Sequence, residues 1–253
     1  MKYLRFYKND EIKHGLLKED TIIELSGNFL YEKAEQTETR YNLSEVKLLP
    51  PVDPGKMVAV GLNYTSHAKE MGREIPEEPM FFMVSPTAII GNDDNIKIPN
   101  INHRIDYEAE LALVIGKKAK NVKQESALSY VFGYTCANDI SDRDLQKRDI
   151  QFTRAKSYDT FKPLGPVIST NINGNDVNIS LSVNSVTKQQ ANTKDFIHSI
   201  DVIIEKITQV MTLYPGDVIL TGTPSGVGSI KPGDKIEINI EGIGTLRNNV
   251  IEN

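Results

Sequence analysis

The pattern of hydrophobic and polar positions divides the chain at a stretch rich in Pro and Gly, PPVDPGK, over residues 50–56. Before this break, the segments KYLRFY, IKHGLLK and TIIELSG have the composition and length of short strands. They predict a small β-rich N-terminal unit over residues 1–54. Because a chain of about 50 residues rarely forms a stable core alone, we expect this unit to pack on a main domain over residues 55–253.

The main domain mixes many strands with few helices. KMVAVGLNY predicts a strand that ends near Gly61, and TSHAKEMG after it has helical composition, with Thr65 or Ser66 available as N-cap. The most regular helical spacing lies in SIDVIIEKITQVMTL, in an apolar stripe formed by Ile200, Ile203, Ile204, Ile207, Val210 and Met211. Strands outnumber helices without a regular β-α-β alternation, so the pattern favours an α+β fold over a doubly wound sheet.

The segment RIDYEAELALVIG, residues 104–116, predicts a strand with two glutamates on one face. Because side chains alternate along a strand, Glu108 and Glu110 point the same way about 6.5–7 Å apart, and the opposite face is apolar. That separation lets both carboxylates reach one ion. A solvated edge strand shows the same alternation, and the segment taken alone favours the edge interpretation.

Composition and charge narrow the possible partners. The chain has 253 residues, a formal net charge of −5 and no basic run, which argues against a nucleic-acid surface. No apolar run approaches the about 18 residues that span a bilayer, and the N-terminus lacks the hydrophobic core of a secretory signal. We therefore expect no membrane partner and a cytoplasmic location. The single cysteine, Cys136, is expected to be a buried, inert thiol.

A second set of polar residues lies in NDISDRDLQ, residues 138–146. If a helical turn begins near Asp139, then Asp139, Arg143 and Gln146 form one stripe; the alternative is an exposed helix with surface salt bridges. Together with Glu108 and Glu110, Asp139 completes an all-oxygen set of three carboxylates. Such a set suits Mg²⁺, Mn²⁺ or Ca²⁺ rather than zinc or copper.

Acid–base chemistry has one candidate pair. His67 and Glu70 stand at i and i+3, where the carboxylate can orient the imidazole and the pair can activate water. A chance helical pair is the competing interpretation. The remaining histidines have no comparable partner in the sequence and are expected to be surface or structural residues: His14, His103 and His198.

Two further segments are ambiguous from the sequence. GTPSGVG, residues 222–228, lacks the Gly-Lys-Ser/Thr end of a phosphate loop and does not match GxGxxG. It predicts a tight turn that can line a pocket through Thr223. Lys156 is an isolated lysine, and such residues are more often solvated than bound to an anion.

Five motifs, taken together, resemble the fumarylacetoacetate hydrolase family. They cover residues about 55–250 and follow the family's order and approximate spacing: VGLNYTSHAKEMG, DYEAELALVIG, GYTCANDISDRDLQ, RAKSYDTFKPLGP and LTGTPSGVG. The resemblance is strongest to bacterial acylpyruvate hydrolases, oxaloacetate decarboxylases and 2-hydroxyhepta-2,4-diene-1,7-dioate isomerases. It implies a mixed β-roll or sandwich with few helices and a homodimer.

The resemblance also implies roles for single residues. The family's metal is held by positions that match Glu108, Glu110 and Asp139, which implies Mg²⁺ or Mn²⁺, with Ca²⁺ able to take its place in crystals. The matches to its catalytic and substrate-binding residues are His67, Glu70 and Lys156 for catalysis and Arg143, Gln146 and Thr223 for substrate binding.

This chain departs from the family pattern at three places. Val84 stands where many members have a lysine, Asp142 stands where they have a small residue, and the segment from Gln146 to Lys156, a mobile lid in relatives, is short. The three departures lie on elements that face the substrate. They bear on the identity of the substrate more than on the metal.

The function implied is that of a Mg²⁺-dependent enzyme acting on a small 2-oxo acid through a metal-bound enolate, with cleavage of a C–C bond. Acylpyruvate hydrolysis and oxaloacetate decarboxylation both fit this chemistry. One alternative is an isomerase or tautomerase of a 2-hydroxy-dienoic diacid or of oxaloacetate. Another is a non-catalytic, metal-bound binding protein.

Overall fold

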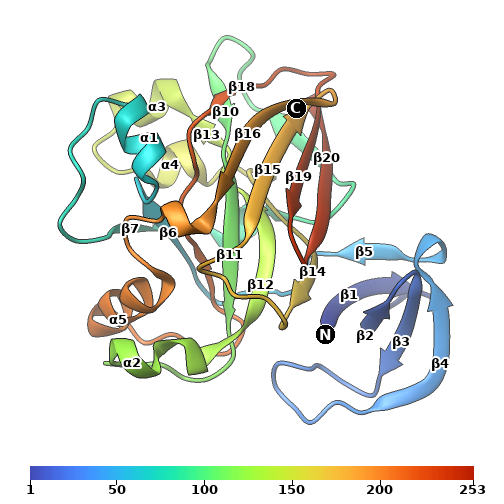
Figure 1. The fold of residues 1–253 in the computed structure, drawn as a ribbon. Helices are drawn as coiled ribbons and strands as arrows, with labels where there is room; N and C mark the ends of the chain where they lie inside the picture. The colour runs from blue at the N-terminus through green and yellow to red at the C-terminus, as the bar shows by residue number, and fades with distance from the viewer.

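A large sheet of twelve strands forms the framework in the computed structural model, which describes residues 1–253 (Figure 1). Ten strands follow one path, with β5 (Lys47–Leu49) paired to β1 and β8 (Ile89–Ile90) paired to β14. In spatial order the ten are β4 (Gln36–Asn42), β3 (Thr21–Leu25), β2 (Glu11–Lys18), β1 (Lys2–Lys8), β14 (Lys162–Ser169), β12 (Val131–Asn138), β11 (Ala109–Ile115), β17 (Val218–Leu220), β6 (Met57–Gly61) and β7 (Met80–Val84).

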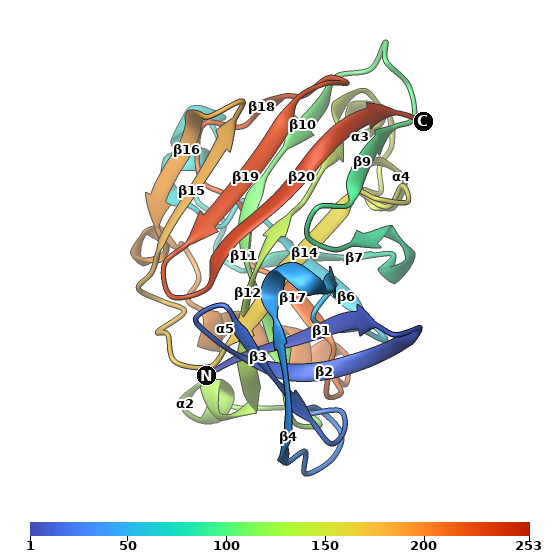
Figure 2. The same ribbon diagram turned by 90° about the vertical axis from the view of Figure 1, so that its right-hand side faces the viewer.

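Two smaller sheets complete the β structure. Figure 2 shows the five-stranded sheet in front of the central strands, in the order β16 (Val186–Asn192), β15 (Asn178–Val183), β19 (Lys235–Ile240), β20 (Gly244–Glu252) and β9 (Asn95–Ile98). The three-stranded sheet consists of β13 (Ser141–Asp142), β10 (Ile105–Tyr107) and β18 (Gly228–Ser229). This mixed β architecture with few helices is the predicted fold class.

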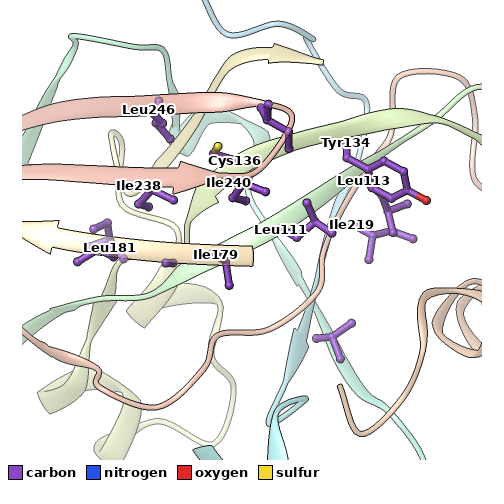
Figure 3. Packing of buried hydrophobic residues seen from close by; sticks show 14 of the residues in the cluster. Leu111, Leu113, Tyr134, Cys136, Ile179, Leu181, Ile219, Ile238, Ile240 and Leu246 are labelled. Atoms are coloured by element: carbon purple, nitrogen blue, oxygen red, sulfur yellow. The ribbon is translucent and has the colours of Figure 1, made fainter. Parts of the chain in front are cut away.

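The main core lies between the large sheet and the five-stranded sheet. A cluster of 38 buried residues fills this space, and Figure 3 shows Leu111 of β11 beside Ile179 and Ile240 of the facing sheet. Cys136 is completely buried in the same cluster, as predicted, and burial raises the pKa of its thiol to about 12. A thiol in that state is not a nucleophile at neutral pH.

The helices are short, with one exception, and lie at two ends of the molecule (Figure 1). Those of the upper end are α1 (Thr65–Glu70), α3 (Arg143–Arg148) and α4 (Thr153–Lys156); those of the lower end are α2 (Gln124–Ala127) and α5 (Ile200–Val210). Single 3₁₀ turns are η1 (Leu43–Glu45), η2 (Pro86–Ala88), η3 (Leu128–Tyr130) and η4 (Thr193–Asp195). The predicted stripe of α5 is correct for its four isoleucines, which are buried, but wrong for Val210, which is 65% exposed at the helix end.

The N-terminal residues extend the large sheet. Tyr3 of β1 pairs with Ile168 of β14, so backbone hydrogen bonds join the first strand to the centre of the molecule. Leu4, Phe6 and Ile22 belong to the main core cluster.

No helix of the structure is both long and apolar enough to cross a bilayer.

The predicted strand over residues 104–116 is interrupted at Glu108. β10 before this residue pairs in the three-stranded sheet, and β11 after it pairs in the large sheet between β12 and β17. Every residue of β11 is buried, since Leu113 faces the main core and Val114 faces a second cluster of 11 residues. The solvated-edge interpretation of this segment is therefore wrong.

Candidate active site

The interruption at Glu108 is held by side chains that come from distant parts of the chain. The Glu108 N–H donates to Asn138 Oδ1 at 2.9 Å, and the Glu108 carbonyl accepts from the Asp139 N–H at 2.9 Å. The Ala109 N–H donates to Gln189 Oε1 at 2.9 Å. Buried backbone groups must find partners, and these bonds satisfy them where the strand is interrupted. They thereby fix the backbone positions of Glu108 and Glu110.

The three predicted metal-binding carboxylates converge at this point. Glu108, Glu110 and Asp139 are 5%, 1% and 1% exposed, and each offers an oxygen within 4.8 Å of the others. They come from the β10–β11 junction, from β11 and from the residue after β12. We call this group the acidic floor. Three convergent carboxylates with no Cys or His form the hard, all-oxygen set that Mg²⁺ and Mn²⁺ prefer.

Basic side chains neutralise two of the three carboxylates. Lys156 Nζ lies 2.8 Å from Glu108 Oε2 and 2.7 Å from Asp139 Oδ2, and Arg143 Nη2 pairs with Glu108 Oε1. Lys162 Nζ lies 2.8 Å from Asp139 Oδ1. Lys156 is 4% exposed, so the sequence-based expectation of a solvated lysine is wrong.

Glu110 differs from the other two carboxylates because it forms no ion pair with a basic side chain. Its Oε2 accepts one hydrogen bond, from the Gly222 N–H at 2.7 Å. Burial, together with the charges of Asp139 and Glu108, raises the pKa of Glu110 well above its usual range. For Glu108, burial opposes ionisation, but Lys156 and Arg143 outweigh it and lower the pKa to about 2. A buried carboxylate without a cationic partner is the feature that a divalent ion would satisfy, so the residues present fit such an ion.

The predicted helical stripe through Asp139 is wrong, although its three residues line the same cavity. Helix α3 begins at Arg143, with Asp142 as its N-cap through a 3.0 Å bond from the Leu145 N–H. Asp139 lies before β13, outside the helix. Arg143 Nη1 donates to Gln146 Oε1 at 2.7 Å, and its Nη2 reaches Glu108, so Arg143 joins α3 to the acidic floor.

Asp142 and His103 form a pair that the sequence did not indicate. Asp142 is fully buried, and its Oδ2 lies 2.6 Å from His103 Nδ1. His103 therefore has a structural role, as expected, although no partner was predicted for it; Asp142, which an exposed helix would place at the surface, is buried. Since Asp142 also caps α3, this pair supports the helix that carries Arg143.

The acid–base pair lies on helix α1, which lines the same cavity as α3. His67 Nδ1 is 3.0 Å from Glu70 Oε2, and because an ionised carboxylate can only accept, Nδ1 carries the proton and Nε2 keeps a lone pair. Glu70 Oε1 accepts from the Gly226 N–H at 3.0 Å. The N-cap of α1 is Tyr64, without a side-chain hydrogen bond, so the predicted cap at residues 65–66 is wrong.

The glycine-rich segment after β17 binds protein carboxylates with its N–H groups. Gly222 and Gly226 donate to Glu110 and Glu70, as described above. Gly222 has a φ of +94°, and a Cβ there would lie 2.9 Å from the Asn63 Cβ, so glycine is required. Thr223 is 4% exposed and accepts a hydrogen bond from Gln189 Nε2 at 2.9 Å.

All nine residues singled out in the sequence line one cavity of about 640 Å³. The rest of its wall mixes apolar and charged side chains, namely Val60, Gly61, Leu62, Met71, Arg73, Met80, Phe82, Arg104, Asp106, Lys147, Phe152 and Val227. Of the family departures, Val84 lies in an apolar cluster, and its strand faces the cavity through Met80 and Phe82. The short segment after Gln146 contributes Lys147 and Phe152.

Sequence reasoning missed four residues that shape this site: Asp106, Asn138, Lys162 and Gln189. Asp106 Oδ2 accepts from Arg143 Nε at 2.8 Å. Asn138 stands directly before Asp139, so its place next to a predicted metal ligand could have marked it as a site residue. Gln189 lies 80 residues from Ala109, which it binds, and nothing local in its strand marks it.

Comparison with known proteins identifies the family. The model described as "Fumarylacetoacetate (FAA) hydrolase C-terminal" matches residues 56–251. The chain belongs to the fumarylacetoacetate hydrolase family. A separate model, "Rv2993c-like, N-terminal", matches residues 1–51. The family assignment agrees with the resemblance carried by the five motifs.

Relatives extend over most of the chain. It is 49% identical over 229 residues to a protein of Methanocaldococcus jannaschii, which covers 90% of this chain and 93% of the relative. It is 45% identical over 225 residues to the oxaloacetate tautomerase YisK of Bacillus subtilis, covering 83% of this chain and 75% of that protein.

Solved structures share the whole fold. A 5-carboxymethyl-2-hydroxymuconate delta-isomerase of Mycobacterium smegmatis superposes with a TM-score of 0.93 at 39% identity, covering 100% of both chains. A maleylpyruvate hydrolase of a Sphingobium species, solved with manganese(II) and pyruvate, has a TM-score of 0.84 at 29% identity, covering 100% of this chain and 99% of that one. Isomerases and hydrolases therefore share this architecture.

Proposed function

We propose that this chain is a divalent-metal-dependent enzyme that transfers a proton between carbon and oxygen of a small 2-oxo acid, interconverting its keto and enol forms. Oxaloacetate is the first candidate substrate. The observation that carries the proposal is the meeting, in one cavity, of the acidic floor with the His67–Glu70 pair. The first supplies a site for a cation, and the second supplies a base.

Glu108, Glu110 and Asp139 would hold the ion. When bound there, a divalent ion supplies Lewis-acid stabilisation of negative charge on substrate oxygens. Arg143 and Lys156 line the same cavity, and each is already paired to the floor, so both are oriented without a further entropy cost. We assign them to the substrate's carboxylate and keto oxygens.

His67 is the base in this proposal. With its Nδ1–H donated to Glu70, Nε2 takes a proton from the carbon next to the keto group. The electron pair of that C–H bond forms a C–C double bond, and the negative charge moves to the keto oxygen. Return of the proton from Nε2 to that oxygen gives the enol, and Glu70 stabilises the imidazolium in between.

Cleavage of a C–C bond is the second candidate. It is favoured by the similarity to a maleylpyruvate hydrolase whose structure contains manganese(II) and pyruvate. For that reaction His67 would activate a water molecule rather than the substrate carbon. The same residues would stabilise the developing charge, so both reactions need the floor and the pair.

The test is a rate assay on oxaloacetate and on acylpyruvates with metal-stripped protein and added Mg²⁺ or Mn²⁺. Loss of enol absorbance without release of pyruvate supports the tautomerase, and release of pyruvate supports cleavage. His67→Asn serves as the control for reaction in the buffer alone. If the wild type and His67→Asn gave equal rates on every acid of the panel, the proposal would be wrong.

A further inference from the structure

Gln189 is a buried amide outside the cavity whose hydrogen bonds reach the acidic floor from behind. It lies on β16 of the five-stranded sheet and is 1% exposed, whereas the next residue, Gln190, is exposed. It does not line the cavity. A polar side chain that is buried this completely needs all of its hydrogen bonds made, and Gln189 makes three.

The first bond fixes the floor. Gln189 Oε1 accepts from the Ala109 N–H at 2.9 Å, and Ala109 is the residue between Glu108 and Glu110. The backbone leaves one sheet and enters another at this point, and the pairing of β11 with β17 begins only at Ala112. Without Gln189 the buried donor would be unsatisfied, and the backbone between the two glutamates would lose its anchor.

The other two bonds fix the glycine-rich segment. Gln189 Nε2 donates to Thr223 Oγ1 at 2.9 Å and to the Pro224 carbonyl at 2.8 Å. The residue before Thr223 is Gly222, whose N–H binds Glu110. Two residues after Pro224 is Gly226, whose N–H binds Glu70. One amide thus holds the segment that contacts both the floor and the acid–base pair.

We propose that Gln189 is a positioning residue that sets the spacing of Glu108 and Glu110 and the register of residues 222–226 against them. The inference rests on the proposed metal site. An amide is required here, because the three bonds of Gln189 need one acceptor oxygen and two donated hydrogens in one plane. Methionine has nearly the same shape and none of these bonds.

The experiment compares Gln189→Met with Gln190→Met, which makes the same change on the exposed side of the same strand. Mn²⁺ affinity is measured by titration calorimetry without substrate, and the Tm of the metal-free proteins is measured in parallel. We expect Gln189→Met to bind Mn²⁺ about 10–100-fold more weakly than the wild type, as for other residues that orient metal ligands. Gln190→Met should match the wild type.

The Mn²⁺ affinity and the Tm together distinguish a positioning role of Gln189 from a merely structural one. A lower Tm of Gln189→Met with unchanged Mn²⁺ affinity would show a merely structural role and overturn this inference alone. Failure of the wild type to bind Mn²⁺ would overturn the proposed function and this inference together. If Gln189→Met does not fold, Thr223→Val removes one acceptor of the Gln189 amide, and a Mn²⁺ affinity equal to that of the wild type would likewise overturn the inference.

Discussion

The acidic floor and the His67–Glu70 pair face the same cavity, but the protein holds them in different ways. The floor is built from strands at the centre of the large sheet, and its three carboxylates are at most 5% exposed. The pair lies on a helix of six residues that has no side-chain N-cap, and the Glu70 side chain is 42% exposed. The floor is enclosed by protein except where it lines the cavity, whereas the pair is held by a short helix and by the bond from the Gly226 N–H to Glu70.

Because the two regions are held independently, we expect that binding of the ion and transfer of the proton can be changed separately by mutation. A preorganised set of buried charges suits an ion whose ligands must not move. The base itself, His67, is 8% exposed and lines the cavity, where it can exchange its proton with water between turnovers. Variants of the floor are therefore expected to change both metal affinity and activity, and variants of the pair to change activity alone.

The largest effect is expected for Glu110→Gln, which removes the unpaired charge of the floor and keeps its shape. Loss of the ion removes several kcal/mol of transition-state stabilisation, so kcat/KM should fall by about 10³-fold or more. Mn²⁺ binding should disappear as well. Because burial raises the pKa of Glu110 and disfavours its charged form in the metal-free fold, the neutral amide of Glu110→Gln should give a metal-free Tm equal to or above that of the wild type.

His67→Asn changes the acid–base pair instead of the acidic floor. It removes the base and leaves the floor intact, so kcat should fall by about 10²–10⁴-fold, with Mn²⁺ affinity unchanged. Stopped-flow rates and calorimetry on the same preparation measure the two quantities. Loss of Mn²⁺ binding in this variant would mean that the two regions are not separable.

Lys156→Met tests whether the lysine competes with the ion for the carboxylates of the acidic floor. The ammonium is bound to Glu108 and Asp139, so its removal should strengthen Mn²⁺ binding by relieving repulsion. Activity should nevertheless fall by about 10²-fold, because a cation that stabilises the substrate's charge is lost. Weaker Mn²⁺ binding would show that Lys156 supports the ligands more than it competes with the ion.

The smallest effect is expected for His103→Gln, which loses the partner of Asp142 outside the cavity. The Asp142 cap of α3 should persist with one bond fewer, lowering the free energy of unfolding by about 1–2 kcal/mol. Urea denaturation measures this change, and kcat should stay within a few-fold of the wild type. A loss of kcat as large as that of His67→Asn would place His103 among the functional residues.

The fold was predictable where local pattern determines structure. The isoleucines of α5 keep the 3.6-residue spacing and are buried together. The α+β class followed from strand-like segments without β-α-β alternation, whereas the mixed β-roll was implied by the family resemblance. The interruption at Glu108 was not predictable, because it depends on Asn138 and Gln189, which lie 30 and 80 residues away from their partners. Periodicity reports the faces of a strand but not the distant side chains that end it.

The candidate site was predictable in its residue types but not in its charge pairing. Alternating glutamates indicated an oxygen-ligand set. The sequence around Lys156 is typical of a solvated lysine, and only the family resemblance implied a catalytic role; its bonds to Glu108 and Asp139 span 48 and 17 residues. The helix through Asp139 was wrong because Asp142 is the N-cap, so that α3 begins at Arg143, four residues after Asp139. Competing capping residues cannot be ranked without the surrounding structure.

The most direct test of the central claim is a titration of metal-stripped wild-type protein with Mn²⁺, followed by calorimetry and by activity on oxaloacetate in the same samples. The account predicts one ion per chain, activity that rises in proportion to the bound ion, and neither signal in Glu110→Gln. Full activity of the stripped protein, or equal Mn²⁺ binding by Glu110→Gln, would contradict it.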